Sequence, residues 1–250
     1  MDHYILLENK VLLGLLGGVF TSALNAIGAI PVFIFKKPSQ RFLNTGLGFA
    51  AGVMLAASFT SLIIPGIELG GILPVIVGIF TGAIVISLID VFAPHVHFDT
   101  SQNSKLKAAW LFFAAITIHN MPEGLSVGVG FGSGEIANAI ALMVAIGTQN
   151  IPEGLSIAFS FVHSGYSRAK SYLYSSISGF VEVPLALIGA AVVSLAKPII
   201  PFAMGFAAGA MIFVIANEII PEVYKSRHER IASYGLIVGL VSMLILDTVL

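Results

Sequence analysis

Two similar polar motifs, 30 residues apart, lie inside long apolar stretches of this chain. Residues 118–126 read Ile-His-Asn-Met-Pro-Glu-Gly-Leu-Ser, and residues 148–156 read Thr-Gln-Asn-Ile-Pro-Glu-Gly-Leu-Ser. Burying a carboxylate in such surroundings is costly unless a partner replaces its hydration, so an acid at membrane depth is usually functional. A bound cation is the simplest partner, and the two motifs therefore predict a cation site.

The residue types in the motifs favour a divalent transition metal. His119 and Glu123 are four residues apart, which places them on one face of a helix. Glu153 has the same place in the second motif, where Gln149 replaces the histidine. Two carboxylates and one imidazole, with amide oxygens near them, suit borderline ions such as Zn²⁺, Fe²⁺ or Mn²⁺. Because two facing carboxylates repel each other in the absence of a cation, a divalent ion would remove that penalty.

The amides and prolines of the motifs admit a second interpretation. Asn120 and Gln149, taken singly, are as typical of hydrogen bonds between membrane helices as of a metal site. Pro122 and Pro152 have no N–H and crowd the preceding turn, so each frees a backbone carbonyl. Free carbonyls at membrane depth are tolerated where they face protein or a polar cavity. We therefore expect both helices to be interrupted at the motifs.

Further acids extend this pattern along the chain. Glu182 lies in the middle of an apolar stretch, and Glu218 lies toward the expected cytoplasmic end of another. Ordered by expected depth from outside to inside, the acids are Asp247, then Glu123, Glu153 and Glu182, then Glu218, Glu222 and Asp90. Such an order is the layout of an ion path. Asp90 and Glu222 are, however, better explained as charges at helix ends, where long side chains reach the interface.

Composition identifies the setting of these residues. The chain is 57% hydrophobic and 10% charged, whereas an average soluble domain is about 25% charged. An integral membrane protein is therefore expected. The chain has no cysteine, which excludes disulfides and thiolate ligands, and it has no basic arm of the kind that binds nucleic acid. Residues 1–4 lack the basic start of a cleaved signal peptide, so the first apolar segment is expected to stay as a helix.

Helices that cross a bilayer must position the motifs. A spanning helix needs about 20 mainly apolar residues. Eight segments meet this requirement: residues 11–35, 42–67, 71–92, 108–131, 136–160, 171–194, 199–221 and 231–250. They nearly exhaust the chain, so we expect an all-α integral membrane protein with one eight-helix transmembrane domain, residues 1–250. The two motifs fall in the fourth and fifth spans.

The distribution of basic residues predicts the orientation of the spans, because cytoplasmic connections are enriched in Lys and Arg. Ten of the 12 basic residues lie in the connections after the first, third, fifth and seventh spans: Lys36, Lys37, Arg41, Lys105, Lys107, Arg168, Lys170, Lys225, Arg227 and Arg230. Lys10 and Lys197 lie on the opposite side, so both termini are expected outside. In the polar connection 93–107, His95 and His97 fit either metal release or an ordinary solvated loop.

Internal similarity predicts an inverted repeat. The second span contains Gly-Phe-Ala-Ala-Gly-Val-Met at 48–54, and the seventh contains Gly-Phe-Ala-Ala-Gly-Ala-Met at 205–211. Both spans end on Ile-Ile-Pro, at 63–65 and 219–221. Because the two spans run in opposite directions in the predicted orientation, spans 1–3 and 6–8 would be related around a central pair, spans 4 and 5. Inverted repeats of this kind place a transported substrate where their interrupted helices meet.

The motifs and spans resemble those of the ZIP family of divalent-metal transporters (Zrt/Irt-like proteins), most closely its bacterial GufA-type branch. The resemblance covers the whole chain and is most specific at His-Asn-x-Pro-Glu-Gly, residues 119–124. It implies metal import toward the cytoplasm, a homodimer and a paired metal centre. The ligands that it implies are His119, Asn120, Glu123, Gln149, Asn150 and Glu153, with a bridging Glu182 and with Glu218 on the cytoplasmic side. Gln149 stands where many members of that family carry histidine, and Asn150 stands where some carry an acid, which lowers the charge of the site.

These observations predict a multi-pass transporter of the cell membrane, without a prosthetic group or an enzymatic activity. Its cargo would be Zn²⁺ or a related ion (Fe²⁺, Mn²⁺, Cd²⁺ or Co²⁺), held between the fourth, fifth and sixth spans. Two alternatives remain open. An intramembrane metalloprotease would need a pair such as His-Glu-x-x-His on one helix, and each motif has at most one histidine. A proton-coupled carrier of an organic substrate would need a wide aromatic cavity, and the chain has one Trp.

Overall fold

The computed structural model describes residues 9–35, 38–92, 104–224 and 229–249, and all regular structure within them is helical. In chain order the helices are α2 (Lys10–Ala29), α3 (Gln40–Ala57), α4 (Ile64–Gly70), α5 (Ile72–Phe92), α6 (Ser104–Ser133), α7 (Ile136–His163), α8 (Arg168–Phe180), α9 (Glu182–Leu195), α10 (Ile200–Val214), α11 (Ile220–Tyr224) and α12 (Glu229–Val249). Short 3₁₀ or π segments join some of them: η1 (Ile30–Phe33), η2 (Ser58–Ile63), η3 (Lys197–Ile199) and η4 (Ile215–Ile219). The predicted all-α class is confirmed, whereas His95 and His97 lie outside the described residues.

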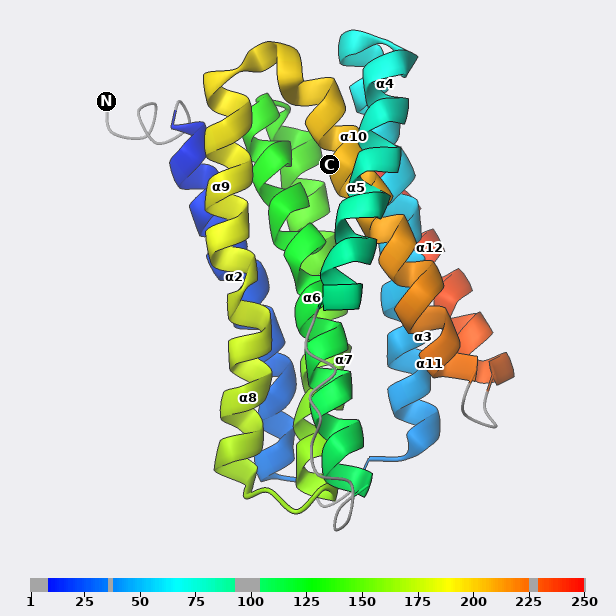
Figure 1. The fold of residues 1–250 in the computed structure, drawn as a ribbon. Helices are drawn as coiled ribbons and strands as arrows, with labels where there is room; N and C mark the ends of the chain where they lie inside the picture. Colours follow the sequence, from blue (N-terminus) through cyan, green and yellow to red (C-terminus); the bar gives the residue numbers. More distant parts are fainter. Residues whose placement is uncertain (1–8, 36–37, 93–103, 225–228, 250) are drawn as a thin grey trace.

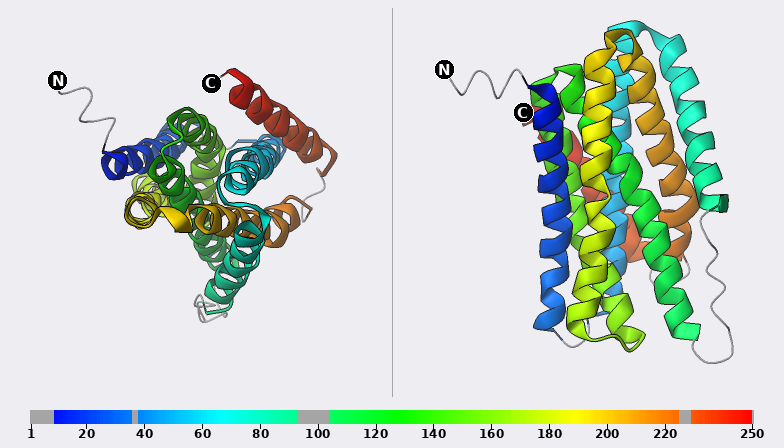
Figure 2. Two further views of the ribbon diagram at one scale, coloured as in Figure 1. Left: turned by 90° about the horizontal axis from the view of Figure 1, so that it is seen from above. Right: turned by 60° about the vertical axis from the view of Figure 1, so that its left-hand side comes forward.

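The helices form one elongated bundle in which the long helices lie side by side (Figure 1). On one side of the bundle α2 packs on α7 and α9 packs on α6, and on the other side α12 packs on α3 and α5 packs on α10. α6 and α7 pack on each other, and they also contact α10 and α3 of the second group. Seen from above, α6 and α7 therefore lie between the two groups, while α5 and α12 project outward (Figure 2). This arrangement encloses the two helices that carry the polar motifs.

Six helical runs of the described chain are long and apolar enough to cross a membrane: Lys10–Phe33, Gln40–Gly70, Ile72–Val91, Arg168–Leu195, Lys197–Glu222 and Glu229–Val249. They correspond to six of the predicted spans, and the chain is therefore a multi-pass membrane protein. The other two predicted spans correspond to α6 and α7, which have 30 and 28 residues. Both helices carry a polar motif, and neither is among the six runs that are long and apolar enough to cross a membrane. That α6 and α7 cross the membrane therefore stays a prediction.

The expectation that prolines interrupt the motif helices is wrong. α6 continues through Pro122 and α7 continues through Pro152 as α-helix, because a proline removes one hydrogen bond while the neighbouring turns keep theirs. The described helices depart from α geometry elsewhere, at the π-helical segments η2 and η4. Each π segment is followed within two residues by a proline, Pro65 or Pro221. Single π turns inside helices often mark functional positions.

Glycines of the repeated sequence allow two close helix contacts. On α3, a side chain at Gly52 would collide with the carbonyl oxygen of Leu236 on α12. On α10, a side chain at the matching Gly209 would collide with the carbonyl oxygen of Ile79 on α5. Small residues let membrane helices approach this closely. Two spans with matched sequences thus pack, at matched glycines, on two different partner helices.

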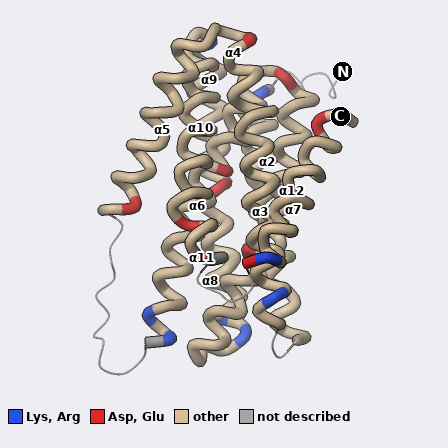
Figure 3. Tube along the Cα trace, turned by 90° about the vertical axis from the view of Figure 1, so that its right-hand side faces the viewer, with Lys and Arg blue, Asp and Glu red and all other residues tan. Residues whose placement is uncertain are grey.

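Charged residues are unevenly distributed along the bundle. The described Lys and Arg residues gather mainly toward one end, and Asp and Glu residues occur along its length (Figure 3). α2 begins and α12 ends toward the opposite end (Figure 1). The basic connections thus lie mainly at one end of the bundle, and the assignment of that end to the cytoplasm stays a prediction.

Five aromatic side chains link α6, α7 and α8. The ring of Trp110 lies 5.1 Å from that of Phe161 in an edge contact and 5.0 Å from that of Tyr174. Phe113 and Tyr166 complete the cluster at 5.4 Å and 6.4 Å from the same indole. Trp110 Nε1 donates to the hydroxyl of Tyr166 at 3.3 Å, so the indole N–H keeps a hydrogen-bond partner.

Replacing Trp110 by alanine should therefore destabilise the protein. Removing a well-packed tryptophan costs about 3 kcal/mol or more, which corresponds to a fall of roughly 6–12 °C in the unfolding midpoint of a chain of this size. Trp110→Phe keeps an aromatic ring in the cluster and should lower the midpoint by less than half as much. Circular dichroism of the purified protein during heating would measure both changes. An unchanged midpoint in Trp110→Ala would contradict the role given to this cluster.

Candidate metal centre

The hairpin of α6 and α7 brings the two motifs to the same depth. Gly134 and Glu135 alone join the helices, and Gly134 has a φ angle of 96°, which a residue with a side chain rarely adopts. His119 and Gln149 each lie 15 residues from Gly134 along the chain. Because all α-helices rise equally per residue, the two motifs come to face each other across the hairpin.

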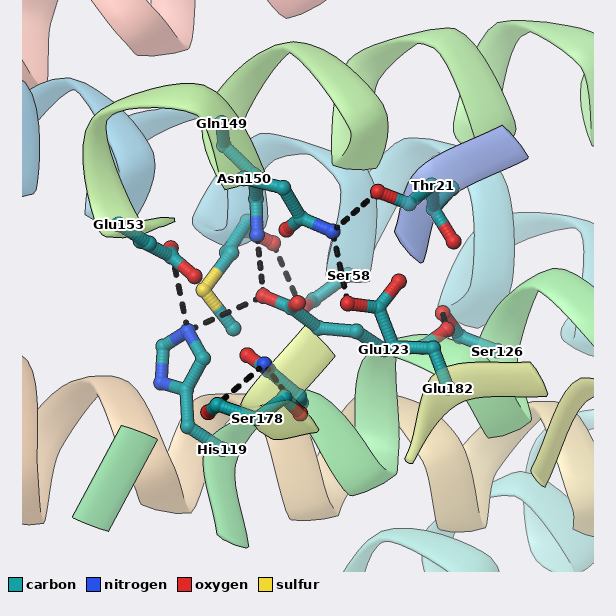
Figure 4. A network of polar contacts seen from close by, with 12 residues as sticks. Thr21, Ser58, His119, Glu123, Ser126, Gln149, Asn150, Glu153, Ser178 and Glu182 are labelled. Atoms are coloured by element: carbon teal, nitrogen blue, oxygen red, sulfur yellow. Dashed lines mark hydrogen bonds and ion pairs between the residues drawn. The ribbon is translucent and has the colours of Figure 1, made fainter. Parts of the chain in front are cut away.

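His119, Glu123 and Glu153 point toward one another between the two helices (Figure 4). His119 Nε2 lies 3.0 Å from Glu123 Oε1 and 3.3 Å from Glu153 Oε1. All three residues are buried, and one ligand atom of each lies within 4.8 Å of the others. Ligands bound to zinc at about 2.0–2.2 Å stand roughly 3.4 Å apart in a tetrahedral site. The geometry of these three residues, called the triad below, thus fits the shared coordination of one ion.

Two asparagine side chains next to the triad bind neighbouring helices through their nitrogen atoms. Asn120 Nδ2 donates to the carbonyl oxygen of Ser178 on α8 at 3.0 Å. Asn150 Nδ2 donates to the carbonyl oxygen of Thr21 on α2 at 3.1 Å and to Glu182 Oε1 at 2.8 Å. Both amides therefore join helices, a role that the sequence left open for Asn120, and this role uses only their N–H groups.

Many oxygen atoms of the centre accept no hydrogen bond. Gln149 Nε2 donates to Glu123 Oε1, but the oxygen of the same amide has no donor. Among the described residues, the buried side-chain oxygens of the centre without a hydrogen-bond partner are Asn120 Oδ1, Glu123 Oε2, Gln149 Oε1, Asn150 Oδ1, Glu153 Oε1, Glu153 Oε2 and Glu182 Oε2. A buried acceptor without a partner is costly. Carboxylate, amide and imidazole groups at this density fit a divalent cation.

Two glycines let neighbouring helices close on the motifs. A Cβ atom at Gly124 would lie 2.5 Å from backbone atoms of Glu182, the first residue of α9. A Cβ atom at Gly154 would collide with the carbonyl oxygen of Asn25 on α2. Each motif glycine thus contacts the backbone of a different helix, and these contacts set how closely α9 and α2 approach the centre.

Glu218, the eighth predicted ligand, lies outside the triad. It lines a cavity of about 480 Å³ together with Asp90, Asn217 and Glu222. Asn217 Nδ2 donates to Asp90 Oδ2 at 3.3 Å, and neither carboxylate oxygen of Glu218 has a hydrogen-bond partner. The predicted ligands therefore divide into a buried central group and one acid that lines a partly open cavity.

Asp247, the outermost acid of the predicted series, lies beside the π segment η2. Ser61 Oγ donates to Asp247 Oδ1 at 3.4 Å. Asn138 on α7 donates through Nδ2 to the carbonyl oxygen of Ser61 at 2.9 Å. Asp247 thus lies where α7 and α12 meet at the irregular turn of the second predicted span.

Three fully buried polar residues near the centre lie outside the motifs, and they were not predicted from the sequence: Thr21, Asn25 and Ser178. Thr21 and Ser178 accept from the two asparagine amides through backbone carbonyls, which every residue type has, so residue identity gives no signal for these contacts. Spacing gives a weak one. Thr21 and Asn25 are four residues apart in an apolar span, as are Ser178 and Glu182, and such pairs share a helix face.

Comparison with known proteins decides what kind of protein carries this centre. The family model described as ZIP Zinc transporter matches residues 99–247. The chain is also 37% identical to the zinc transporter ZIPB of Bordetella bronchiseptica, over 97% of this chain and 84% of that protein. The chain belongs to the ZIP zinc transporter family. The resemblance inferred from the motifs is therefore confirmed.

Other relatives of this ZIP protein come from distant organisms. It is 35% identical to the zinc transporter ZIP11 of Homo sapiens, over 96% of this chain and 98% of that protein. It is 33% identical to the zinc transporter GufA of Myxococcus xanthus, over 94% of this chain and 97% of that protein. The part that matches the ZIP family model contains both motifs and all eight predicted ligands.

Proposed function

We propose that this ZIP protein carries divalent transition-metal ions, above all Zn²⁺, across the cell membrane into the cytoplasm. The observation that carries the proposal is the triad, whose ligand atoms lie within 4.8 Å of one another in the buried hairpin. One imidazole and two carboxylates form a donor set suited to a borderline divalent ion. Relatives named as zinc transporters support zinc as the main cargo.

The residues around the triad have complementary roles in this proposal. The triad binds the ion directly, and the free amide oxygens of Asn120, Gln149 and Asn150 are available to complete its coordination. Glu182 lies behind Asn150, one hydrogen bond away. Glu218 meets the ion on the cytoplasmic side, in the cavity of about 480 Å³. The triad and Glu218 would thus provide successive positions for one positive ion.

We also propose that α6 and α7 complete a set of eight spans with both termini outside, and that the spans form an inverted repeat. α3 and α10 run in opposite directions (Figure 1), and each passes into a π segment before Ile-Pro. In this repeat, span 2 corresponds to span 7 and span 3 corresponds to span 8. The packing follows the same correspondence, because α3 (span 2) packs on α12 (span 8) and α10 (span 7) packs on α5 (span 3). Rocking of such repeats would expose the centre to each side in turn. A homodimer stays a prediction.

Neither alternative function is favoured. A metalloprotease would need more than one histidine on the metal, and the triad contains one. Moreover, the ZIP family consists of transporters, not of enzymes. A carrier of organic molecules would need a cavity at the centre, whereas all seven predicted ligands of the central group are fully buried.

Transport by the purified protein in lipid vesicles tests the proposal directly. Zn²⁺ should enter with saturable kinetics, and Cd²⁺, Co²⁺, Fe²⁺ and Mn²⁺ should compete with it. Mg²⁺ and Ca²⁺ should compete poorly, because they prefer a shell made entirely of oxygen ligands. Vesicles without protein give the background. Uptake no faster than this background, or equal transport of Mg²⁺, would contradict the proposal.

A further inference from the structure

The side-chain amide of Asn150 links Glu182 to α2. Its Nδ2 donates to the carbonyl oxygen of Thr21 at 3.1 Å and to Glu182 Oε1 at 2.8 Å. Asn150 and Glu182 are both fully buried, as is Thr21. Figure 4 shows this nitrogen between Thr21 and Glu182, with one dashed line to each. Both N–H groups of the amide are therefore in use, one on each acceptor.

The acceptors fix the orientation of this amide. A backbone carbonyl, such as that of Thr21, has no hydrogen to donate. If the amide were turned over, Asn150 Oδ1 would face the Thr21 carbonyl and the Glu182 carboxyl group, and two acceptors would repel it. Asn150 must therefore present N–H groups to Glu182, and it leaves Oδ1 without a partner. The place beside Glu182 Oε1 that a cation would take is thus occupied by a donor.

Glu182 also lies outside the triad. Within the described parts of the chain, the triad is the only group of three or more His, Asp or Glu residues with ligand atoms within 4.8 Å of one another. A zinc site has at least three protein ligands. Glu182 has one oxygen bonded to Asn150, and only its Oε2 lacks a partner. A second ion next to Glu182 would therefore find one free oxygen on this residue and, among the described residues, no second acidic or histidine group that completes a triad there.

We propose that the centre binds one divalent ion at a time, and that the amide of Asn150 takes the place of a second ion beside Glu182. This inference rests on the transport function proposed above and assigns the number of ions to it. The N–H group carries partial positive charge and satisfies Glu182, while Oδ1 of the same amide stays free for the ion at the triad. An acid at position 150 would instead set two carboxyl groups side by side, a place that attracts a cation.

Counting bound ions tests this assignment. The full-length protein is dialysed against excess Zn²⁺, and elemental analysis gives the number of ions per chain. Glu182→Gln should bind as many ions as the wild type, because glutamine keeps an oxygen acceptor for Asn150. Asn150→Asp should bind one more ion than the wild type. Loss of one ion in Glu182→Gln, or no gain in Asn150→Asp, would overturn the one-ion proposal.

A measurement on the unaltered protein avoids any effect of substitutions on folding. Two metal ions in one centre lie about 3.5–4 Å apart, and X-ray absorption at the zinc edge detects such pairs. The zinc-loaded wild type should show nitrogen and oxygen ligands without a zinc neighbour at this distance, and Asn150→Asp should show one. A zinc pair in the wild type would overturn the one-ion proposal and leave the transport function intact. Failure of Glu153→Gln to lose an ion would count instead against the triad, and so against the proposed function.

Discussion

Replacing Glu123 and Glu153 together by alanine should reduce saturable zinc uptake to the level of vesicles without protein. Both carboxylates approach the same atom, His119 Nε2, at 3.0 and 3.3 Å, so the double variant keeps only one residue of the triad. Substitutions in the shell outside metal ligands already lower metal affinity about 10–100-fold. Because loss of two direct ligands should weaken metal binding more than any such change, we expect uptake to fall by more than about 1,000-fold.

Variants of equal shape separate the loss of charge from the loss of structure. Glu123→Gln and Glu153→Gln keep the size of the side chain, and each should lower uptake by at least about 100-fold. Their metal-free unfolding midpoints should not fall, because each substitution removes one of two facing carboxylates that repel each other in the absence of a cation. Glu135→Gln is the matched control, since Glu135 lies exposed on the turn of the same hairpin. Normal uptake in the double variant would eliminate the triad as the transport site.

Spacing along the chain predicts much of this centre. The four-residue interval between His119 and Glu123 predicts that they share a helix face, and the structure places them 3.0 Å apart. The duplicated motif predicts that Glu153 joins them, and the equal arms of the hairpin around Gly134 bring it there. Intervals and duplications are properties of the chain itself, so the sequence records them directly.

Contacts between backbones leave much weaker traces in the sequence. Thr21 and Ser178 orient the amides of Asn150 and Asn120 through carbonyl groups, and every residue has such a group. The expectation that Pro122 interrupts its helix fails for a related reason. The turns before and after a proline can keep the helix continuous, and their packing is not visible in the sequence. Geometry of this kind depends on which helices pack together, and only the three-dimensional structure supplies that information.

Gly124→Ala should impair both stability and transport although it adds a single methyl group. The new Cβ atom would lie 2.5 Å from the Cα atom and the carbonyl oxygen of Glu182, and backbone atoms cannot turn aside as a side chain can. Inserting carbon into a tightly packed contact costs about 1–3 kcal/mol, or roughly 2–12 °C in the unfolding midpoint. Displacement of α9 would also strain the hydrogen bond from Asn150 to Glu182. Uptake should therefore fall about tenfold or more, as for other changes around a metal site.

The same helix supplies a matched control for this prediction. A Cβ atom at Gly130 would lie 3.5 Å from its nearest neighbours, side-chain atoms of Ala139 and Leu142, which is an ordinary contact. Because alanine favours helix more than glycine by up to about 1 kcal/mol, Gly130→Ala should leave uptake unchanged and keep or slightly raise the unfolding midpoint. Vesicle uptake and thermal unfolding would be measured for both variants side by side. If the two behaved alike, the close contact between α6 and α9 would have no part in shaping the centre, and the position of Glu182 would have to depend on other contacts.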